Sequence, residues 1–228
     1  MSHPVRRIAA VALALAFAAP AAMQAQRPGE PDWFTEPGER VEGVMIGLYG
    51  GFVPGISVRG KEAYDGLEVE TAWANSLGIQ LGYGLTSRWL VYLNVDRSDH
   101  NTNNDFVARG LTSLHHVDIG VRHHFHLENE RLIPYANLGV GMRQLYAKHA
   151  RDTLNADRTV RIVLTARALS PGGGVHYFFS ENFAVDGNLQ LGIGAFNRVS
   201  PRGPRGRDLK TDSDMSFRLR VGIAWFPT

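Results

Sequence analysis

The chain of 228 residues contains no cysteine, and after residue 22 it has no apolar run approaching the length of a membrane helix. Without cysteine there are no disulfides, no thiol nucleophile and no thiolate metal ligand. A helix that crosses a bilayer needs about 20 consecutive apolar residues, and residues 23–228 do not supply them. These absences exclude a disulfide-stapled scaffold and a protein that crosses the membrane with helices.

An excess of one charge sign is also missing. The chain has 24 Lys and Arg against 22 Asp and Glu. The first 25 residues contain Arg6 and Arg7 and no acid, so their removal leaves 22 basic against 22 acidic residues and a formal net charge of zero. An exported, neutral protein lacks the basic excess that nucleic-acid binding requires, so no nucleic-acid partner is expected.

The N-terminus carries an export signal. The basic segment M-S-H-P-V-R-R precedes fifteen apolar residues, 8–22, and the small residue Ala25 follows. This order predicts a secretory signal peptide over residues 1–25. A retained anchor is the alternative, but fifteen residues fall short of the roughly 20 that a spanning helix needs. Residues 26–40 contain three prolines and no alternation, which predicts a flexible N-terminal segment before one domain over 41–228.

Period-two alternation is what the chain has in abundance. In S-L-G-I-Q-L-G-Y-G-L, residues 76–85, apolar side chains occupy odd positions and Ser, Gly or Gln the even ones. After the polar turn 86–88 the alternation resumes in W-L-V-Y-L-N-V-D. Such a pattern predicts a β-hairpin. Eight alternating runs occur, at 44–52, 76–85, 89–96, 117–127, 134–143, 160–179, 183–194 and 217–225.

The connections between these runs alternate in length. The short ones are 86–88, 128–131 and 180–182. The long, polar ones are 54–70, 98–114, 148–158 and 198–215. Short turns at one end and long loops at the other are typical of a transmembrane barrel. The sequence therefore predicts an all-β fold, an eight-stranded antiparallel up-and-down transmembrane β-barrel with both termini on the short-turn side.

The sixth run is the least regular. Its apolar residues Leu164 and Ala166 lie on even positions, whereas Val175 and Tyr177 lie on odd ones. The segment S-P-G-G-G, residues 170–174, lies where the parity changes. Because Gly and Pro are tolerated at β-bulges, we expect a bulge there that restores the facing.

Two assignments of the faces are open. The Leu/Ile/Val face is the core in a soluble sandwich or lipocalin-like barrel, and faces lipid in a membrane barrel. The other face is rich in Gly with isolated Asp and Arg, which suits a narrow interior where small and large side chains alternate. We therefore expect lipid outside and a lumen without an aqueous channel. Buried charges require pairing, and the expected interior charge network is Asp96, Asp118, Asp186, Arg122, Arg143, Arg218 and Arg220.

Aromatic side chains on the apolar face support this choice, although aromatics are common in any β protein. Two girdles that flank an aliphatic band are what the two bilayer interfaces select. One set lies beside the short turns: Tyr83, Trp89, Phe125, Tyr177, Phe179, Phe183 and Trp225. The other lies toward the long loops: Phe52, Trp73, Tyr146 and Phe217.

Three segments resemble the outer-membrane β-barrel domain family, the OmpA/OmpX-like eight-stranded barrels of Gram-negative bacteria. They are G-L-Y-G-G-F-V-P-G (47–55), Y-A-N-L-G-V-G-M (135–142) and G-G-G-V-H-Y-F-F-S-E-N-F-A-V-D (172–186). The resemblance covers residues 41–228 and implies an outer-membrane location, contact with lipopolysaccharide and a monomeric state. It also implies that Phe226, near the C-terminus, belongs to the signal read by the barrel-assembly machinery.

Three features could carry chemistry. His124, His126 and His176 are expected to point inward near the short turns, where three imidazoles could bind zinc; hydrogen-bonded polar filler is the favoured interpretation, so no metal or other cofactor is expected. Ser98 and His100 share one parity and could serve a lipid A acyltransferase or deacylase, but no third partner is apparent. The last long loop is basic and could contact anionic lipid or simply be solvated: Arg198, Arg202, Arg205, Arg207 and Lys210.

No catalytic set, cofactor motif or open channel emerges from these features. The sequence therefore predicts a non-enzymatic barrel with a structural, envelope-integrity or surface-interaction role. The alternative is a lipid A-modifying enzyme that uses an outward-facing Ser98–His100 pair.

Overall fold

The structure is a computed structural model that describes residues 41–54, 57–59, 68–70, 73–102, 110–127, 131–152, 155–200, 207–208 and 213–227. The expected signal peptide and N-terminal segment lie outside these residues. In the described part of the chain, no helix is long and apolar enough to cross a membrane. Eight long strands form the body: β1 (Gly43–Val53), β4 (Ala74–Gly84), β5 (Trp89–Thr102), β6 (Gly110–His124), β7 (Leu132–Asp152), β8 (Asn155–Phe178), β9 (Phe183–Ser200) and β11 (Ser213–Trp225).

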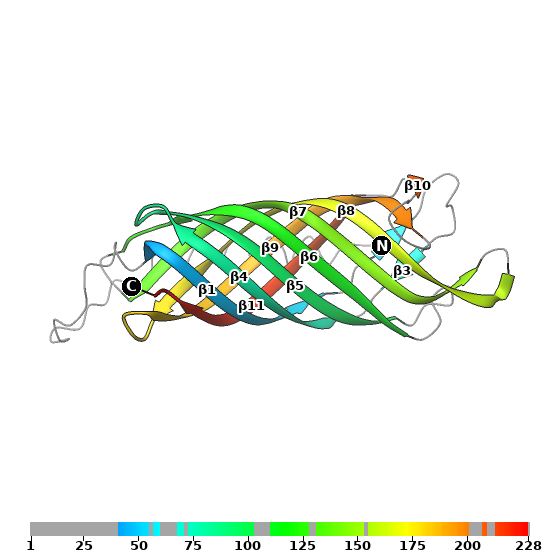
Figure 1. Cartoon of the computed structure of the whole chain (residues 1–228), viewed down its shortest axis with the longest axis horizontal. Coiled ribbons are helices and arrows are strands. Elements are labelled where there is room, and N and C mark those ends of the chain that lie inside the picture. Colours follow the sequence, from blue (N-terminus) through cyan, green and yellow to red (C-terminus); the bar gives the residue numbers. More distant parts are fainter. Residues whose placement is uncertain are drawn as a thin grey trace, which may run out of the picture.

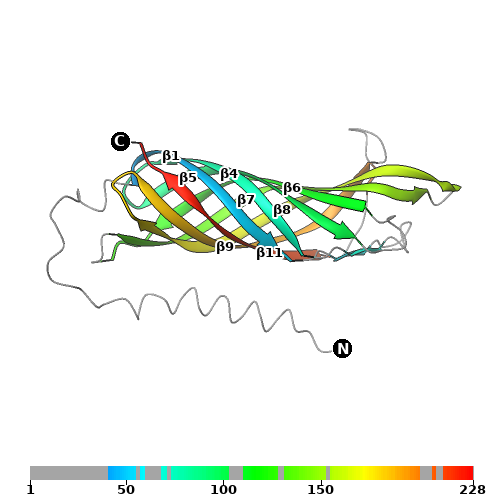
Figure 2. The same cartoon turned by 90° about the horizontal axis from the view of Figure 1, so that it is seen from below.

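The strands pair antiparallel with their sequence neighbours, and β1 pairs with β11, so the sheet closes on itself. Figures 1 and 2 show the resulting tilted barrel, with the end of β11 beside the start of β1 at the end where the short turns lie. The prediction of an eight-stranded antiparallel up-and-down barrel is confirmed.

The barrel has a stagger of ten residues. Stepping from partner to partner around the sheet from Leu48 leads to Ser213, whereas Leu48 itself pairs with Ile223, ten residues further along β11. Strand number and stagger together set the tilt and radius of a barrel. Side chains that are distant in sequence therefore meet across the lumen.

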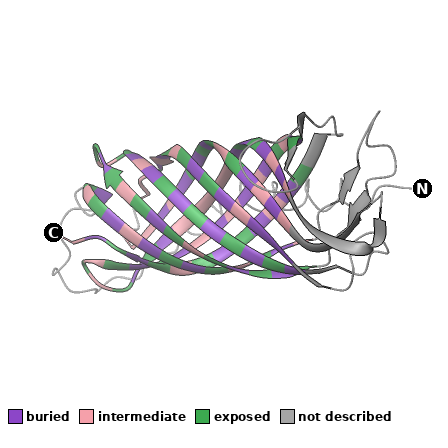
Figure 3. Ribbon diagram, turned by 45° about the vertical axis from the view of Figure 1, so that its right-hand side comes forward, coloured by how far each residue is buried: buried purple, intermediate pink, exposed green. Residues whose placement is uncertain are grey.

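Where the burial of their side chains is described, the strands alternate between inward-facing buried residues and more exposed ones, as the banding in Figure 3 shows. Large apolar side chains such as Leu48, Ile79, Val140 and Val221 point outward and are about half exposed. Charged side chains such as Asp186, Arg122 and Arg218 point inward and are buried. Such an exterior would be unstable in water and matches the hydrocarbon core of a bilayer, so the barrel spans a membrane with its apolar face toward lipid.

The facing of β8 differs from the prediction. The even residues Leu164, Ala166 and Ala168 are buried inside the barrel, in the same parity as His176 and Phe178. Pairing with β7 keeps one register through residues 170–174, so the bulge expected there is absent. An irregularity occurs instead between Thr165 and Ala166, where β8 pairs with β9. The even apolar residues belong to the lumen because the long-loop end of the lumen is itself partly apolar, as described below.

Several strands also run further than predicted. β5 continues to Thr102, β6 begins at Gly110, and β7 and β8 are separated only by residues 153–154. The expected loops 98–114 and 148–158 are thus largely strand. The alternation of apolar and polar residues ends where the strands pass beyond the apolar belt, the band of outward-facing apolar side chains. It therefore cannot show where the strands end on the long-loop side. Three short strands lie within the long connections: β2 (Ser57–Arg59), β3 (Glu68–Glu70) and β10 (Arg207–Asp208).

Side-chain hydroxyls close two of the short turns. Thr86 Oγ1 accepts from the backbone N–H of Arg88 and of Trp89 at 3.3 and 3.1 Å. Ser180 Oγ accepts from the N–H of Phe183 at 3.0 Å. These Ser/Thr turns satisfy backbone donors where the strand ladder has ended. They make the short-turn end compact.

Candidate functional site

The interior of the barrel holds the charged residues, and all seven members of the expected network lie there. Each is at most 2 % exposed except Asp96, at 3 %. Charges buried this deeply need partners, because an unpaired one costs several kcal/mol. Their contacts form two groups, one near the short turns and one near the middle of the barrel.

Asp186 is the centre of the first group. Its Oδ2 accepts from the hydroxyl of Tyr49 at 2.7 Å, and its Oδ1 accepts from that of Tyr135 at 2.6 Å. Oδ2 also lies 3.2 Å from His176 Nε2 and 3.6 Å from Arg122 Nη1. One carboxylate from β9 thus ties together β1, β6, β7 and β8.

Arg122 completes that group. Its Nη1 is 2.8 Å from His176 Nε2, and its Nη2 donates to Gln80 Oε1 at 2.8 Å. The guanidinium carbon lies 3.8 Å from the centre of the Tyr135 ring, which is a cation–π contact. The charge is therefore matched by Asp186 and surrounded by polar and aromatic groups.

The second group joins β11 to β5 and β9. Arg218 forms a salt bridge with Asp96, and its Nη2 donates to Gln190 Oε1 at 2.7 Å. Arg220 donates to Asn94 Oδ1 at 2.6 Å and to Asn188 Oδ1 at 2.9 Å. Arg220 Nη1 also lies 3.7 Å from Asp96 Oδ2. The amides of Asn94 and Asn188 lie on the inner parity of their strands, but the sequence offered no sign that they would join an acid in contacting Arg220.

Asp118 and Arg143 lie at the margins of this second group. Asp118 Oδ2 is 3.3 Å from His116 Nε2 and 3.8 Å from Arg218 Nη2. Arg143 donates to Ser216 Oγ at 2.8 Å, and its guanidinium lies 5.5 Å from the centre of the Phe196 ring.

Glycines make room for the largest luminal side chains. A Cβ atom added to Gly120 would lie 2.6 Å from the hydroxyl of Tyr92, and one added to Gly139 would lie 2.8 Å from the same oxygen. Tyr92 can therefore extend across the lumen only because its neighbours on β6 and β7 lack side chains. This is the alternation of small and large residues that a narrow barrel needs.

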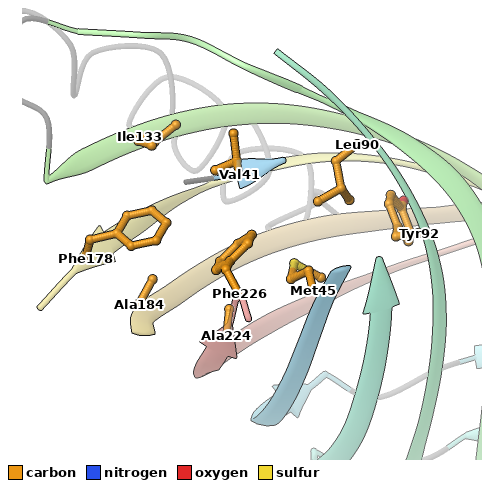
Figure 4. Packing of buried hydrophobic residues seen from close by; sticks show 9 residues of the cluster. All are labelled: Val41, Met45, Leu90, Tyr92, Ile133, Phe178, Ala184, Ala224 and Phe226. Atoms are coloured by element: carbon orange, nitrogen blue, oxygen red, sulfur yellow. The ribbon is translucent and has the colours of Figure 1, made fainter. Parts of the chain in front are cut away.

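An apolar layer of buried side chains lies at the short-turn end of the barrel (Figure 4). Phe226 belongs to it, with its ring centre 5.3 Å from that of Phe178 and its N–H donating to the carbonyl of Asn182 at 2.8 Å. The C-terminal aromatic is therefore built into the barrel. Members of this layer are Val41, Met45, Leu90, Tyr92, Ile133, Phe178, Ala184, Ala224 and Phe226.

A second apolar group lies inside the barrel toward the long loops. Leu114 pairs with Leu145, Leu145 pairs with Leu164, and Ala166 pairs with Phe196. All five are at most 2 % exposed. Inward-facing apolar residues on β8 are thus part of a continuous inner wall, which explains why parity counting mistook them for lipid-facing residues.

The three histidines considered for zinc do not form one site. His124 and His176 are buried with ring centres 5.5 Å apart, but His126 Nε2 donates to the carbonyl of Ser87 at 2.9 Å. Among the described residues there is no group of three or more His, Asp or Glu arranged to hold a metal ion.

The Ser98–His100 pair exists but faces inward, so the expectation of an outward-facing pair is wrong. Ser98 Oγ lies 2.9 Å from His100 Nε2, and the two residues are 1 % and 0 % exposed. Asp99, between them in sequence, points outward and accepts from Ser113 Oγ at 2.8 Å. Lipid on the outside of the barrel cannot reach the serine.

Of the five basic residues of the last long connection, only Arg198 has a described side chain, and it is exposed. Arg202, Arg205 and Lys210 lie outside the described residues, as does the side chain of Arg207.

Aromatic residues occur at both ends of the outer surface. At the short-turn end Phe183 stacks on Trp225 at 6.2 Å, and His123, an exception to the apolar alternation of β6, lies 4.6 Å from Trp89. At the long-loop end Trp73 meets Phe217 edge-on at 6.4 Å.

No model of a known protein family matches the chain, and neither does any curated protein. Among solved structures, Neisserial surface protein A superposes with a TM-score of 0.52 at 13 % identity, over 82 % of this chain and 100 % of that one. OprG, an outer membrane protein from Pseudomonas aeruginosa, superposes with a TM-score of 0.53 at 14 % identity, over 81 % of this chain and 95 % of that one.

The chain is a β-barrel of the outer-membrane type. The superpositions establish a shared fold, and at such low identities the likeness extends no further, so the function depends on the residues of this barrel itself.

Proposed function

We propose that this outer-membrane-type barrel is a non-enzymatic envelope protein with a plugged lumen, serving envelope integrity or surface interactions. Its place is the outer membrane of a Gram-negative bacterium, with the short turns and both ends of the chain in the periplasm. That location agrees with the apolar exterior, with the signal peptide predicted over residues 1–25, and with the description of OprG as an outer membrane protein.

The observation that carries the proposal is the filling of the interior. From the short-turn end inward, the barrel holds the apolar layer around Phe226, then the Asp186–Arg122 group, then the Arg218 and Arg220 group. Eight strands enclose a space just wide enough for side chains to fill. A filled interior supports a scaffold for loops rather than a pore.

The remaining parts of the proposal concern processing and partners. The mature protein begins after Ala25, with residues 26–40 as a flexible segment and 41–228 as the barrel domain. Lipopolysaccharide and other outer-membrane lipids surround the barrel, which functions as a monomer. The barrel-assembly machinery inserts it.

A lipid A-modifying enzyme is the alternative, and it has lost its main support. The nucleophile and base that it required, Ser98 and His100, point away from the bilayer and are buried. Ser113, on the parity of β6 opposite to the lumen, donates a hydrogen bond to Asp99 rather than to a histidine.

One experiment separates the two functions. Lipid A is extracted from cells with and without the gene, and its mass spectrum is compared alongside the sensitivity of the cells to detergent. We expect an unchanged lipid A spectrum and increased detergent sensitivity in the deletion strain. A change in acyl-chain number that is abolished by Ser98→Ala or His100→Ala would overturn the proposal.

A further inference from the structure

The outer surface changes character where β5 leaves the apolar belt. Its outward residues are apolar up to Val95, and the next two are Arg97 and Asp99. By register Arg97 neighbours His115 on β6, and His115 neighbours Gln144 on β7. A polar row therefore begins at the belt's edge on β5–β7, whereas the outward residues of β11 stay apolar as far as Met215.

A groove lies at one end of this polar row. Its volume is about 480 Å³, and its walls come from β1, from β4 with the residue preceding it, and from β5. Trp73 and Leu77 are the most exposed large apolar side chains among the described residues, at 68 % and 76 %, and Phe52 lines the same groove. The groove thus joins an apolar wall to the charged pair Arg97–Asp99.

The guanidinium at this groove is held in place. Arg97 donates through Nε and Nη2 to Asp99 Oδ1, at 3.1 and 3.0 Å, and Ser113 donates to the same oxygen. The side chains of Arg97 and Asp99 nevertheless remain 55 % and 46 % exposed. The hydrogen bonds to Asp99 orient the guanidinium. Because an exposed ion pair contributes little free energy, it does not prevent Arg97 from contacting a phosphate group as well.

We propose that this groove is a binding site for the lipid A portion of lipopolysaccharide. Arg97 contacts a lipid A phosphate, and Phe52, Trp73 and Leu77 contact an acyl chain. His115 and Gln144 extend the polar row toward the sugar hydroxyls. The inference deepens the proposed function and rests on its outer-membrane placement, because lipopolysaccharide is the outer-leaflet lipid of that membrane.

Two observations favour this occupant. The groove is continuous with the apolar belt that the bilayer covers, so its neighbour is a lipid at the boundary between acyl chains and headgroups. Arginine matches phosphate because its planar donors form charge-assisted hydrogen bonds. A lipid that presents phosphate at that boundary fits both halves of the groove at once.

The test is native mass spectrometry of the full mature chain, folded in detergent micelles and titrated with bis-phosphorylated hexa-acyl lipid A. We expect one tightly retained lipid A, and about tenfold weaker retention by Arg97→Gln, as loss of one charge-assisted hydrogen bond predicts. Trp73→Ala should weaken retention as well. Arg88→Gln, in a turn at the opposite end of the barrel, is the matched control and should bind like the wild type.

Lipid competitors define the headgroup. Dephosphorylated lipid A should bind Arg97→Gln and wild type equally, and phosphatidylglycerol should not displace bis-phosphorylated lipid A at equal concentration. Equal retention by Arg97→Gln and Arg88→Gln, or displacement by phosphatidylglycerol, would overturn the site. Gel mobility of unboiled samples shows that each variant is folded. Failure here would leave the envelope function standing, since the deletion strain tests that function separately.

Discussion

At the scale of single residues, the barrel contains a buried carboxylate, Asp186, that is satisfied by several partners at once. Asp186 receives hydrogen bonds from Tyr49 and Tyr135 and faces Arg122. Asp99 also pairs with an arginine, but at the surface. The two aspartates allow the same substitution to be compared in two environments.

We expect Asp186→Ala to lower the free energy of unfolding by about 3–5 kcal/mol, because it leaves Arg122 buried without its counter-charge. Asp99→Ala should cost about 0–1 kcal/mol, as for other exposed ion pairs. Urea unfolding in phospholipid vesicles, followed by tryptophan fluorescence, measures both. Equal losses for the two variants would contradict the assigned role of Asp186.

Gly120 is a position where even one methyl group is excluded. Its Cβ would lie 2.5 Å from the carbonyl oxygen of Leu138 and 2.6 Å from the Tyr92 ring. We expect Gly120→Ala to destabilise the barrel by about 1–3 kcal/mol through overpacking. Gly50→Ala, on the outer face with nothing within 4 Å, should be neutral or up to about 1 kcal/mol stabilising. The same unfolding measurement distinguishes them, and a harmless Gly120→Ala would mean that Tyr92 lies elsewhere.

At the scale of elements, each strand presents one face to lipid and one to the lumen. The free-energy cost of a charged substitution on the lipid face depends on how deep in the bilayer the residue lies. On β11, Val221 lies midway between the aromatic residues Phe217 and Trp225, while Met215 lies beyond Phe217 toward the loops. Both are about half exposed.

We expect Val221→Arg to cost about 2–4 kcal/mol and Met215→Arg about 0–1 kcal/mol, because the penalty for a lipid-facing charge falls toward the interface. Unfolding in bilayers measures the difference. If Val221→Arg were as stable as the wild type, the facing of β11 would be inverted.

The facing of β8 can be tested with two leucines of the same strand. Leu164 is 1 % exposed and inside, whereas Leu169 is 43 % exposed and faces lipid. We expect Leu164→Ala to cost about 2–5 kcal/mol because it leaves a cavity beside Leu145. Leu169→Ala should cost less, since lipid tails fill the space. The reverse order of stabilities would restore the parity predicted from the sequence.

At the scale of the whole molecule, the filled interior predicts that the barrel conducts little or no ion current. The charged groups and the apolar layer around Phe226 lie inside the barrel, and under the proposed function they block its axis. Planar-bilayer recordings of the folded protein test this, with a porin as positive control. Stable porin-like steps would mean that the interior opens, and the plugged-lumen proposal would fail.

Much of this architecture could be predicted from local sequence. The period of two identifies the strands, because successive side chains of a strand point to opposite faces. The glycine-rich second face then indicates that the apolar face is the one toward lipid. On this basis the positions of Asp96, Asp186, Arg122 and Arg218 inside the lumen follow from parity alone. The short turns follow from the short polar gaps between the alternating runs.

Other features were decided only by the tertiary structure. Arg220 donates hydrogen bonds to Asn94 and Asn188, which are 126 and 32 residues away in sequence. Closure of the barrel with a ten-residue stagger places these three residues at the same depth in the lumen. Leu145 and Phe196 belong to an apolar inner wall, and the hydrophobic residues of β8 that pair with them face the lumen instead of lipid. Alternation records that a side chain is apolar, but lipid and a packed lumen are both apolar surroundings. Only the closed barrel, through register and stagger, distinguishes one from the other.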